Sequence, residues 1–252
     1  MDCHTVWDRR SIQNITWYCP LPSEIQAKGW QKVTYKKNEQ EGIEFVSNFG
    51  TTLNYIASSI PFDGNIKVFS QDESRIGLLP IQRRIQRRRI TLRVIKPISH
   101  VQQEFKSYYL YGSVEPLTGE NFFLELPALD TACFQVYIDE LSKAYKDSFN
   151  ILILDRGSFH KSNSLRLPSN VAFILLPPYS PELNPIERVL FFRWSAERQW
   201  ESVKDEIANE IYPDIDSLKN RVASVLSDYA DSTFSSLTSY PYLINAVNDV
   251  FQ

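Results

Sequence analysis

Residues 149–155 read FNILILD, an almost unbroken apolar run that ends in an acid. Such a run predicts a strand that is buried on both faces, as strands in parallel sheets are. Residues 171–178 read VAFILLPP, a second apolar run that ends in two prolines. Two buried strands separated by a short helical connection predict an α/β fold whose second half is parallel.

The segments upstream of this pair favour antiparallel strands. Alternation of apolar and polar residues predicts strands, and turn residues at 116–119 predict a hairpin between two of them. Apolar positions three or four apart predict helices, one of them capped by Asp130 or Thr131. The chain is therefore expected to form a mixed α/β layout. The expected strands are 66–73, 90–95, 105–114, 121–126, 149–154 and 171–176, and the expected helices are 42–60, 130–146 and one that begins near Pro185.

The composition predicts a globular protein. The chain has 252 residues, of which 43% are hydrophobic; its balanced charge and 13% aromatic residues argue against disorder, and its 8 glycines exclude collagen-like structure. Three scattered cysteines argue against a disulfide scaffold and fit a reducing cytoplasm. No apolar run is long enough for a membrane span, and the N-terminal residues lack the pattern of a signal peptide. A cytoplasmic location with no membrane partner is therefore expected.

Basic residues are concentrated in one segment. The formal net charge is −3, yet residues 75–96 hold eight arginines and lysines and no acid. Arginine makes planar, paired contacts to phosphate, so this arginine-rich segment suits a polyanion such as a nucleic acid. The alternative is a hairpin whose charges are simply solvated.

Two expected strands end in an acid, at Asp72 and at Asp155. In open α/β sheets ligands bind beyond the ends of parallel strands, and Mg²⁺ prefers oxygen ligands of this kind. Acids at strand ends also serve as helix caps or turn formers, which leaves a structural role open for each.

A third acid, Glu187, closes the string PPYSPELNPIE at residues 177–187. Asn184 at the N-cap, Pro185 at the first helical position and Glu187 two residues later have the spacing of a capping box. A capping role for Glu187 and a role beside Asp72 and Asp155 are compatible, because an acid in the first helical turn also points toward the adjacent strand ends.

Three strings in this order carry a resemblance: DESR at 72–75, LDRGSFHK at 154–161 and the string at 177–187. Over residues 42–195 the chain resembles the DDE-type transposases of bacterial insertion sequences, the branch related to mariner elements. The resemblance implies an α/β, ribonuclease H-like fold with a mixed five-stranded sheet flanked by helices. It also implies three catalytic, metal-binding carboxylates, which here are Asp72, Asp155 and Glu187.

The resemblance further implies two Mg²⁺ or Mn²⁺ ions and metal-dependent DNA cleavage and strand transfer. One ion would activate the attacking water or 3′-hydroxyl, and the other would stabilise the leaving oxygen. Asp72 is expected to bridge the two ions. The expected partners are the transposon ends and the target DNA, with a homodimer in the active complex and a location at the nucleoid.

Several basic residues are candidates for contact with DNA. His160 either touches a phosphate, supports the carboxylates or is a capping residue. Lys161 and Arg188 flank the expected site, and each is either a contact to the DNA backbone or a solvated charge. The full predicted nucleic-acid-binding set is Arg83, Arg84, Arg87, Arg88, Arg89, His160, Lys161 and Arg188.

The sequence departs from the family at Arg156, where its members usually carry Asn. Its guanidinium either pairs with Asp155, in competition with metal, or faces DNA. Residues 190–195 are unusually apolar, and residues 1–40 are too short for the family's end-recognition domains. The expected division is an N-terminal extension and helix at 1–62, a catalytic domain at 63–205 and a helical tail at 206–252.

Two alternative functions follow from these departures. One is a catalytically decayed, non-enzymatic DNA-binding remnant that uses the arginine-rich segment. The other is a ribonuclease H-like nuclease that acts on another nucleic acid.

Overall fold

The computed structural model describes residues 37–60, 64–79, 104–190, 203–208 and 210–251, all of which fall in one structural unit. The strands are β1 (Asn65–Gly77), β2 (Ser107–Val114), β3 (Asn121–Leu126), β4 (Ser148–Leu154) and β5 (Val171–Leu175). The α-helices are α1 (Glu39–Ser59), α2 (Thr131–Ala144), α3 (Glu187–Leu190), α4 (Val203–Glu206), α5 (Ile215–Asp228), α6 (Asp231–Thr238) and α7 (Pro241–Phe251). Two 3₁₀ turns, η1 (Ser158–Lys161) and η2 (Pro181–Leu183), flank β5.

The five strands form one mixed sheet in the order β3-β2-β1-β4-β5. β1 pairs antiparallel with β2 and parallel with β4, so it joins the two halves of the sheet. β2 and β3 are antiparallel, and β4 and β5 are parallel. The predicted mixed five-stranded sheet is therefore confirmed, whereas the strand predicted at 90–95 lies outside the described residues.

The prediction that the first strand ends at Asp72 is wrong. β1 continues to Gly77, because its pairing with β2 runs from Ser70 to Gly77. Its pairing with β4 stops at Ser70, so Asp72 lies where β1 passes the end of its parallel neighbour. Asp72 thus belongs to the carboxyl edge of the parallel half while remaining inside a strand.

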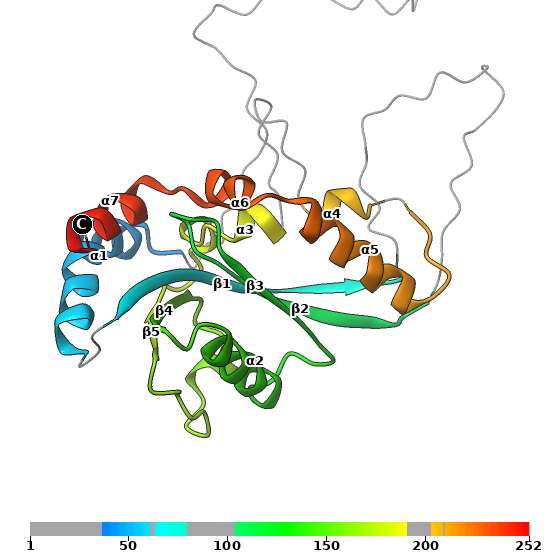
Figure 1. Ribbon diagram of the computed structural model, residues 1–252, viewed down its shortest axis with the longest axis horizontal. Helices are drawn as coiled ribbons and strands as arrows, with labels where there is room; N and C mark the ends of the chain where they lie inside the picture. The colour runs from blue at the N-terminus through cyan, green and yellow to red at the C-terminus, as the bar shows by residue number, and fades with distance from the viewer. Residues whose placement is uncertain (1–36, 61–63, 80–103, 191–202, 209, 252) are drawn as a thin grey trace, which may run out of the picture. The chain divides into compact units, whose positions relative to one another are not determined.

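Helices cover both faces of the sheet (Figure 1). α2 packs on one face, over a core that includes Phe69 and Leu152. The other face carries two buried clusters. In one of them α1 and α7 pack against Val68 and Ile151, and in the other α3, α5 and α6 pack over β1 and β2.

The helices outside the predicted catalytic domain are thus part of the same packing. α1 lies in the range 1–62 and α7 in the range 206–252, yet Leu53 of α1 and Leu243 of α7 are buried in one cluster with the sheet. Helices from the first and last of the three ranges therefore share a buried core with the sheet of the middle range. The division into three parts stays a prediction from the sequence.

Polar side chains cap the longer helices. The Asp130 carboxylate accepts from the backbone N–H of Cys133, which makes Asp130 the cap of α2. The Asn38 side chain accepts from the N–H of Gln40 and starts α1 earlier than the apolar pattern alone predicts. These bonds satisfy donors that a helix start otherwise leaves unpaired.

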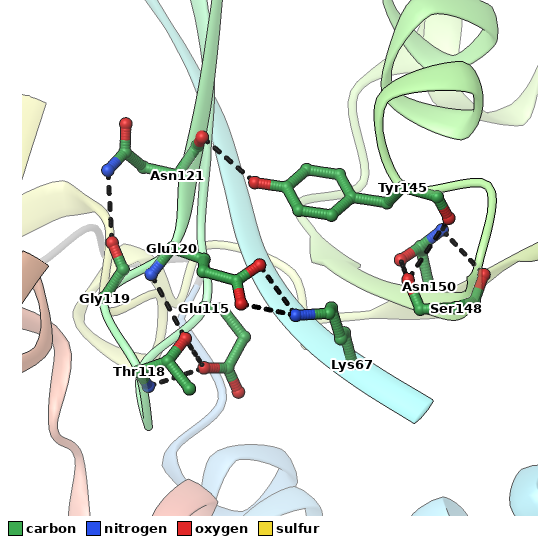
Figure 2. Close-up of polar contacts among 9 residues, drawn as sticks. All are labelled: Lys67, Glu115, Thr118, Gly119, Glu120, Asn121, Tyr145, Ser148 and Asn150. Carbon is green, nitrogen blue, oxygen red and sulfur yellow. Dashed lines mark hydrogen bonds and ion pairs between the residues drawn. The ribbon is translucent and has the colours of Figure 1, made fainter. Parts of the chain in front are cut away.

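The turn between β2 and β3 is closed by its own side chains (Figure 2). The Glu115 carboxylate accepts from the backbone N–H and the hydroxyl of Thr118, and Lys67 of β1 pairs with Glu120 at 2.6 Å. Gly119 has a positive φ of 83°. The tip of the turn contacts α6, where the Ser235 hydroxyl donates to the backbone carbonyl of Pro116.

We expect Gly119→Ala to destabilise the protein by at least about 2 kcal/mol. A Cβ at this position would lie 1.8 Å from the Asp231 carbonyl oxygen, and the positive φ disfavours any side chain. Urea unfolding followed by circular dichroism measures the change. Gly50→Ala in α1 is the control, because its Cβ would meet Ala246 at an ordinary 3.7 Å and alanine favours the helix. Equal stability of the two variants would contradict the expectation.

Candidate active site

Asp72 and Asp155 are side by side at the edge of the sheet. The last parallel pair between β1 and β4 joins Ser70 to Ile153. Asp72 follows Ser70 by two residues, and Asp155 follows Ile153 by two residues. Side chains two residues apart in a strand point to the same face. The register of the two strands therefore directs both carboxylates to the face that carries α1 and α3.

Glu187 reaches the same place from the first turn of α3. The preceding residue, Ile186, is fully buried in the cluster over β1 and β2. Its side chain lies next to Gly112, the residue of β2 that pairs with Asp72. A Cβ added to Gly112 would lie 3.4 Å from Ile186 Cδ1. The same Cβ would lie 2.5 Å from the ring of Phe123, so only glycine leaves room for both side chains beside Asp72.

The carboxyl groups influence one another's charge. Burial raises the pKa of Asp72 well above its usual range, and the nearby carboxylates of Glu187, Glu73 and Asp155 raise it further. The pKa of Asp155 is lowered, chiefly because it accepts a hydrogen bond from His160. Two aspartates that are neighbours in the sheet are thus pushed in opposite directions, as is common at functional sites.

The predicted capping box at Asn184 is not formed. The Asn184 side chain turns toward β1 and its Nδ2 donates to the backbone carbonyl of Gln71 at 2.9 Å, while its Oδ1 is buried without a hydrogen-bond partner among the described residues. The Glu187 backbone N–H instead donates to the Asn184 backbone carbonyl at 3.2 Å. Asn184 therefore links the start of α3 to the residue that precedes Asp72.

The chain reaches this point through a strained turn. Tyr179 adopts a φ of 56°, in the left-handed region that is uncommon for residues other than glycine. It lies between the end of β5 and the 3₁₀ turn η2, on the path of the chain to α3.

His160 lies between two carboxylates. Its Nδ1 is 3.0 Å from Asp155 Oδ1 and its Nε2 is 3.2 Å from Glu73 Oε1. The Gln71 side chain also donates to Glu73 Oε1, at 2.8 Å. The imidazole side chain is 1% exposed and packs on the ring of Phe134 at 4.5 Å.

These contacts favour one of the roles expected for His160. Its burial lowers the pKa of the ring, but hydrogen bonds to Asp155 and Glu73 outweigh that effect and raise the pKa to about 9. With both ring nitrogens engaged and almost no exposed surface, the ring offers a phosphate no free donor in this structure. The structure favours the supporting role, and Glu73 is part of it.

The other predicted contacts lie around this centre. Lys161 is exposed, and its charge adds to the lowering of the Asp155 pKa that His160 begins. The Arg188 guanidinium lies 4.2 Å above the ring of Tyr240, so it is held against the C-terminal helices. Contact of either residue with DNA stays a prediction.

Arg156 does not pair with Asp155 in the structure. Its Nε donates to the backbone carbonyl of Leu176 at 2.9 Å, at the end of β5, which corrects the expectation of a competing ion pair. The side chain is exposed, so the alternative that it faces DNA remains a prediction. Five of the six predicted arginines lie outside the described residues; they are Arg83, Arg84, Arg87, Arg88 and Arg89.

Sequence reasoning missed two residues of the site. Asn184 has an obvious capping role in the sequence, and nothing in the spacing indicates a bond to a distant strand. Gly112 carried a signal, because a glycine inside a strand often marks the close approach of another segment.

No group of three His, Cys, Asp or Glu side chains in the described part of the chain is arranged so that it could hold a metal ion as it stands. Asp72, Asp155 and Glu187 are close enough to affect one another's charge, and all three offer the oxygen ligands that Mg²⁺ and Mn²⁺ prefer. The chemistry of the donors fits a divalent cation.

We expect Asn184→Ala to lower the free energy of unfolding by about 1–3 kcal/mol, because it leaves the buried Gln71 carbonyl without its donor. Chemical denaturation measures the loss. Asn163→Ala, at an exposed position, should change stability by less than about 0.5 kcal/mol. A loss no larger than that of the control would mean that the bond does not hold α3 to the sheet.

The His160 ring of the metal-free protein should titrate near pH 9 rather than near 6.5. Since the folded state raises the pKa, the stabilisation is fully present below pH 6.5 and disappears as the pH rises through about 9. Proton–nitrogen NMR of the ring follows the titration, and His160→Asn identifies the signal among those of the three histidines. A midpoint at the usual value would show that the two carboxylates do not hold the proton.

The amino-acid sequence is similar to that of known proteins. A model of the family described as DDE superfamily endonuclease matches residues 67–219, more than half of the chain. The uncharacterized protein y4pE/y4sA of Sinorhizobium fredii is 31% identical over 125 residues, which are 49% of this chain and 85% of that protein. The range 67–219, which the family model matches, includes all three predicted carboxylates.

Solved structures share the fold. The Mos1 transposase paired-end complex with left transposon end has a TM-score of 0.59 and 17% identity, over 86% of this chain and 63% of that chain. The Mos1 mariner paired end complex with Mn has a TM-score of 0.57 and 16% identity, over 91% and 68%. This chain therefore spans less than two thirds of the length of the first.

No helix in the described ranges is long and apolar enough to cross a membrane. The strand order, with β1 parallel to β4 and antiparallel to β2, and the likeness to the Mos1 structures confirm the predicted ribonuclease H-like fold. Together with the match over residues 67–219, they show that the chain belongs to the DDE superfamily endonucleases.

Proposed function

We propose that this chain catalyses metal-dependent DNA strand cleavage and strand transfer of an insertion sequence. One observation carries the proposal. The register between β1 and β4 puts Asp72 beside Asp155, and the Glu187 carboxylate is near enough to raise the pKa of Asp72. Three carboxylates on one edge of a ribonuclease H-like sheet match the resemblance that the sequence suggested.

The electrostatics of the cluster favour a divalent cation. The carboxylates repel one another, and together with burial this repulsion raises the pKa of Asp72. A dication among them would turn that repulsion into attraction. The Mos1 structures include paired end complexes with Mn and with Mg. We infer that two Mg²⁺ or Mn²⁺ ions would be held by Asp72, Asp155 and Glu187.

The residues of this chain have separate tasks in the reaction. When bound, the ions lower the pKa of the attacking water or 3′-hydroxyl and stabilise the leaving oxygen. Asp72 is near enough to both other carboxylates for each to raise its pKa, and Asp155 stays ionised because His160 donates to it. Glu187 approaches from α3 on the same face. No serine or cysteine nucleophile is required.

DNA is the proposed substrate. The arginine-rich segment, with Arg83, Arg84, Arg87, Arg88 and Arg89, would contact the backbone by charge, and the exposed Lys161 and Arg156 would add to it near Asp155. One of the similar Mos1 structures is a transposase paired-end complex with left transposon end. Two ends must be brought together for transposition, so we propose a dimer for the active complex.

Nicking of a supercoiled plasmid tests the activity. With Mn²⁺ or Mg²⁺ the purified chain should nick DNA, and a chelator should stop it. Asp72→Asn and Asp155→Asn should each lower the rate more than about 100-fold, since losing even an outer partner of a metal ligand costs 10–100-fold. Asp147→Asn is the control, because this exposed acid precedes β4 at the opposite end of the strand from Asp155.

Binding of the same DNA separates the alternative. A chain that binds DNA with strong salt dependence, but neither nicks it nor responds to the two aspartate changes, would be the non-catalytic remnant. Cleavage of RNA–DNA hybrids in preference to duplex DNA would instead indicate a different nuclease.

A further inference from the structure

The His160 imidazole makes contacts on both sides of its ring. On one side Nδ1 lies 3.0 Å from Asp155 Oδ1, and on the other Nε2 lies 3.2 Å from Glu73 Oε1. The ring comes from the short turn η1, a few residues after Asp155, whereas Glu73 comes from β1. The imidazole therefore joins the end of β4 to the strand that carries Asp72.

Two nitrogen atoms lie close to one oxygen of the Asp155 carboxylate, and His160 Nδ1 also lies 3.2 Å from the Asp155 backbone carbonyl oxygen. Oδ1 accepts from the backbone N–H of Gly157 at 2.7 Å and lies 3.0 Å from His160 Nδ1. The hydrogen bond from Gly157 and the close His160 nitrogen both lie on Oδ1 and so restrict rotation of the carboxylate, although the side chain is 62% exposed. The second oxygen, Oδ2, has no hydrogen bond within the described ranges and is the atom left for a cation.

The ring is itself held in place. The Glu73 side chain is 6% exposed and accepts from both His160 and Gln71 through Oε1. Aromatic rings close the remaining sides, with Phe134 and Phe159 at 4.5 and 4.1 Å between ring centroids. A ring packed in this way has little freedom to leave Asp155.

Glu73 also touches the other aspartate. Its backbone N–H donates to Asp72 Oδ1 at 2.8 Å, while its side chain reaches Asp155 through His160. A single residue thus connects one oxygen of each aspartate.

We propose that His160, held by Glu73, is a positioning residue that turns Asp155 so that its Oδ2 faces the divalent cation. This inference rests on the proposed metal site and deepens it. Partners that orient a metal ligand in this manner typically change metal affinity by 10–100-fold.

Two substitutions of His160 separate the two sides of the ring. The amide nitrogen of asparagine takes a place close to that of Nδ1, and the amide nitrogen of glutamine takes a place close to that of Nε2. His160→Asn therefore keeps a donor to Asp155, whereas His160→Gln keeps only a donor to Glu73. Both variants lose the ring and its charge, so each is the matched control of the other.

The measurement is Mn²⁺ affinity of the full chain, from the electron paramagnetic resonance signal of free Mn²⁺. We expect His160→Gln to bind Mn²⁺ about 10-fold more weakly than the wild type, with His160→Asn closer to the wild type. Thermal unfolding of both proteins checks that they are folded to the same extent.

The sign of the change excludes other roles. If His160 acted only through its charge, both variants would bind Mn²⁺ more tightly, because a positive charge beside the cation is gone. If it acted only by packing, both would lose affinity equally. Either result overturns the proposal. Absence of Mn²⁺ binding by the wild type would instead contradict the proposed metal site itself.

A wild-type measurement covers the case in which a variant does not fold. Nitrogen NMR of the histidine rings during a Mg²⁺ titration should show Nδ1 of His160 shifting more than Nε2, along the same saturation curve as the backbone signals of Asp72 and Asp155. A His160 ring that does not respond while those signals saturate would overturn the proposal.

Discussion

The site depends on one constraint, the register between β1 and β4. With Ser70 opposite Ile153, Asp72 and Asp155 lie level with each other on one face. A slip of one residue would send one of the two carboxylates to the face that α2 covers. The apolar side chains make such a slip costly, because Val68 and Phe69 are buried on opposite faces and would have to exchange environments. Burial of the core therefore sets the geometry of the acids.

The price of gathering acids is repulsion, and the chain offsets it locally. Burial and neighbouring carboxylates push Asp72 toward its neutral form. Around Asp155 and Glu73 the chain supplies a cation of its own in His160, sealed under aromatic rings. The charge of His160 is held between Asp155 and Glu73, whereas the exposed side chain of Asp155 can still receive a ligand.

Much of the fold could be predicted from the sequence. The apolar runs at 149–154 and 171–176 and the alternation at 121–126 gave strands close to their observed bounds. The end of β1 was misplaced because its continuation depends on pairing with β2, a contact that no local pattern shows. The three acids followed from a resemblance, but the Asn184 bond to Gln71 and the left-handed Tyr179 are set by tertiary packing. Local capping rules explained Asn184 well and were still wrong.

The bare backbone of Gly112 has a consequence for how this sequence can vary. The space above it is shared by Phe123 from β3 and Ile186 from α3, so three segments far apart in the chain divide one small volume next to Asp72. A larger residue at any one of these positions can be accepted only if another becomes smaller. In relatives that keep the three acids, the residues at these three positions should therefore vary together, so that their total side-chain volume is conserved while their identities change.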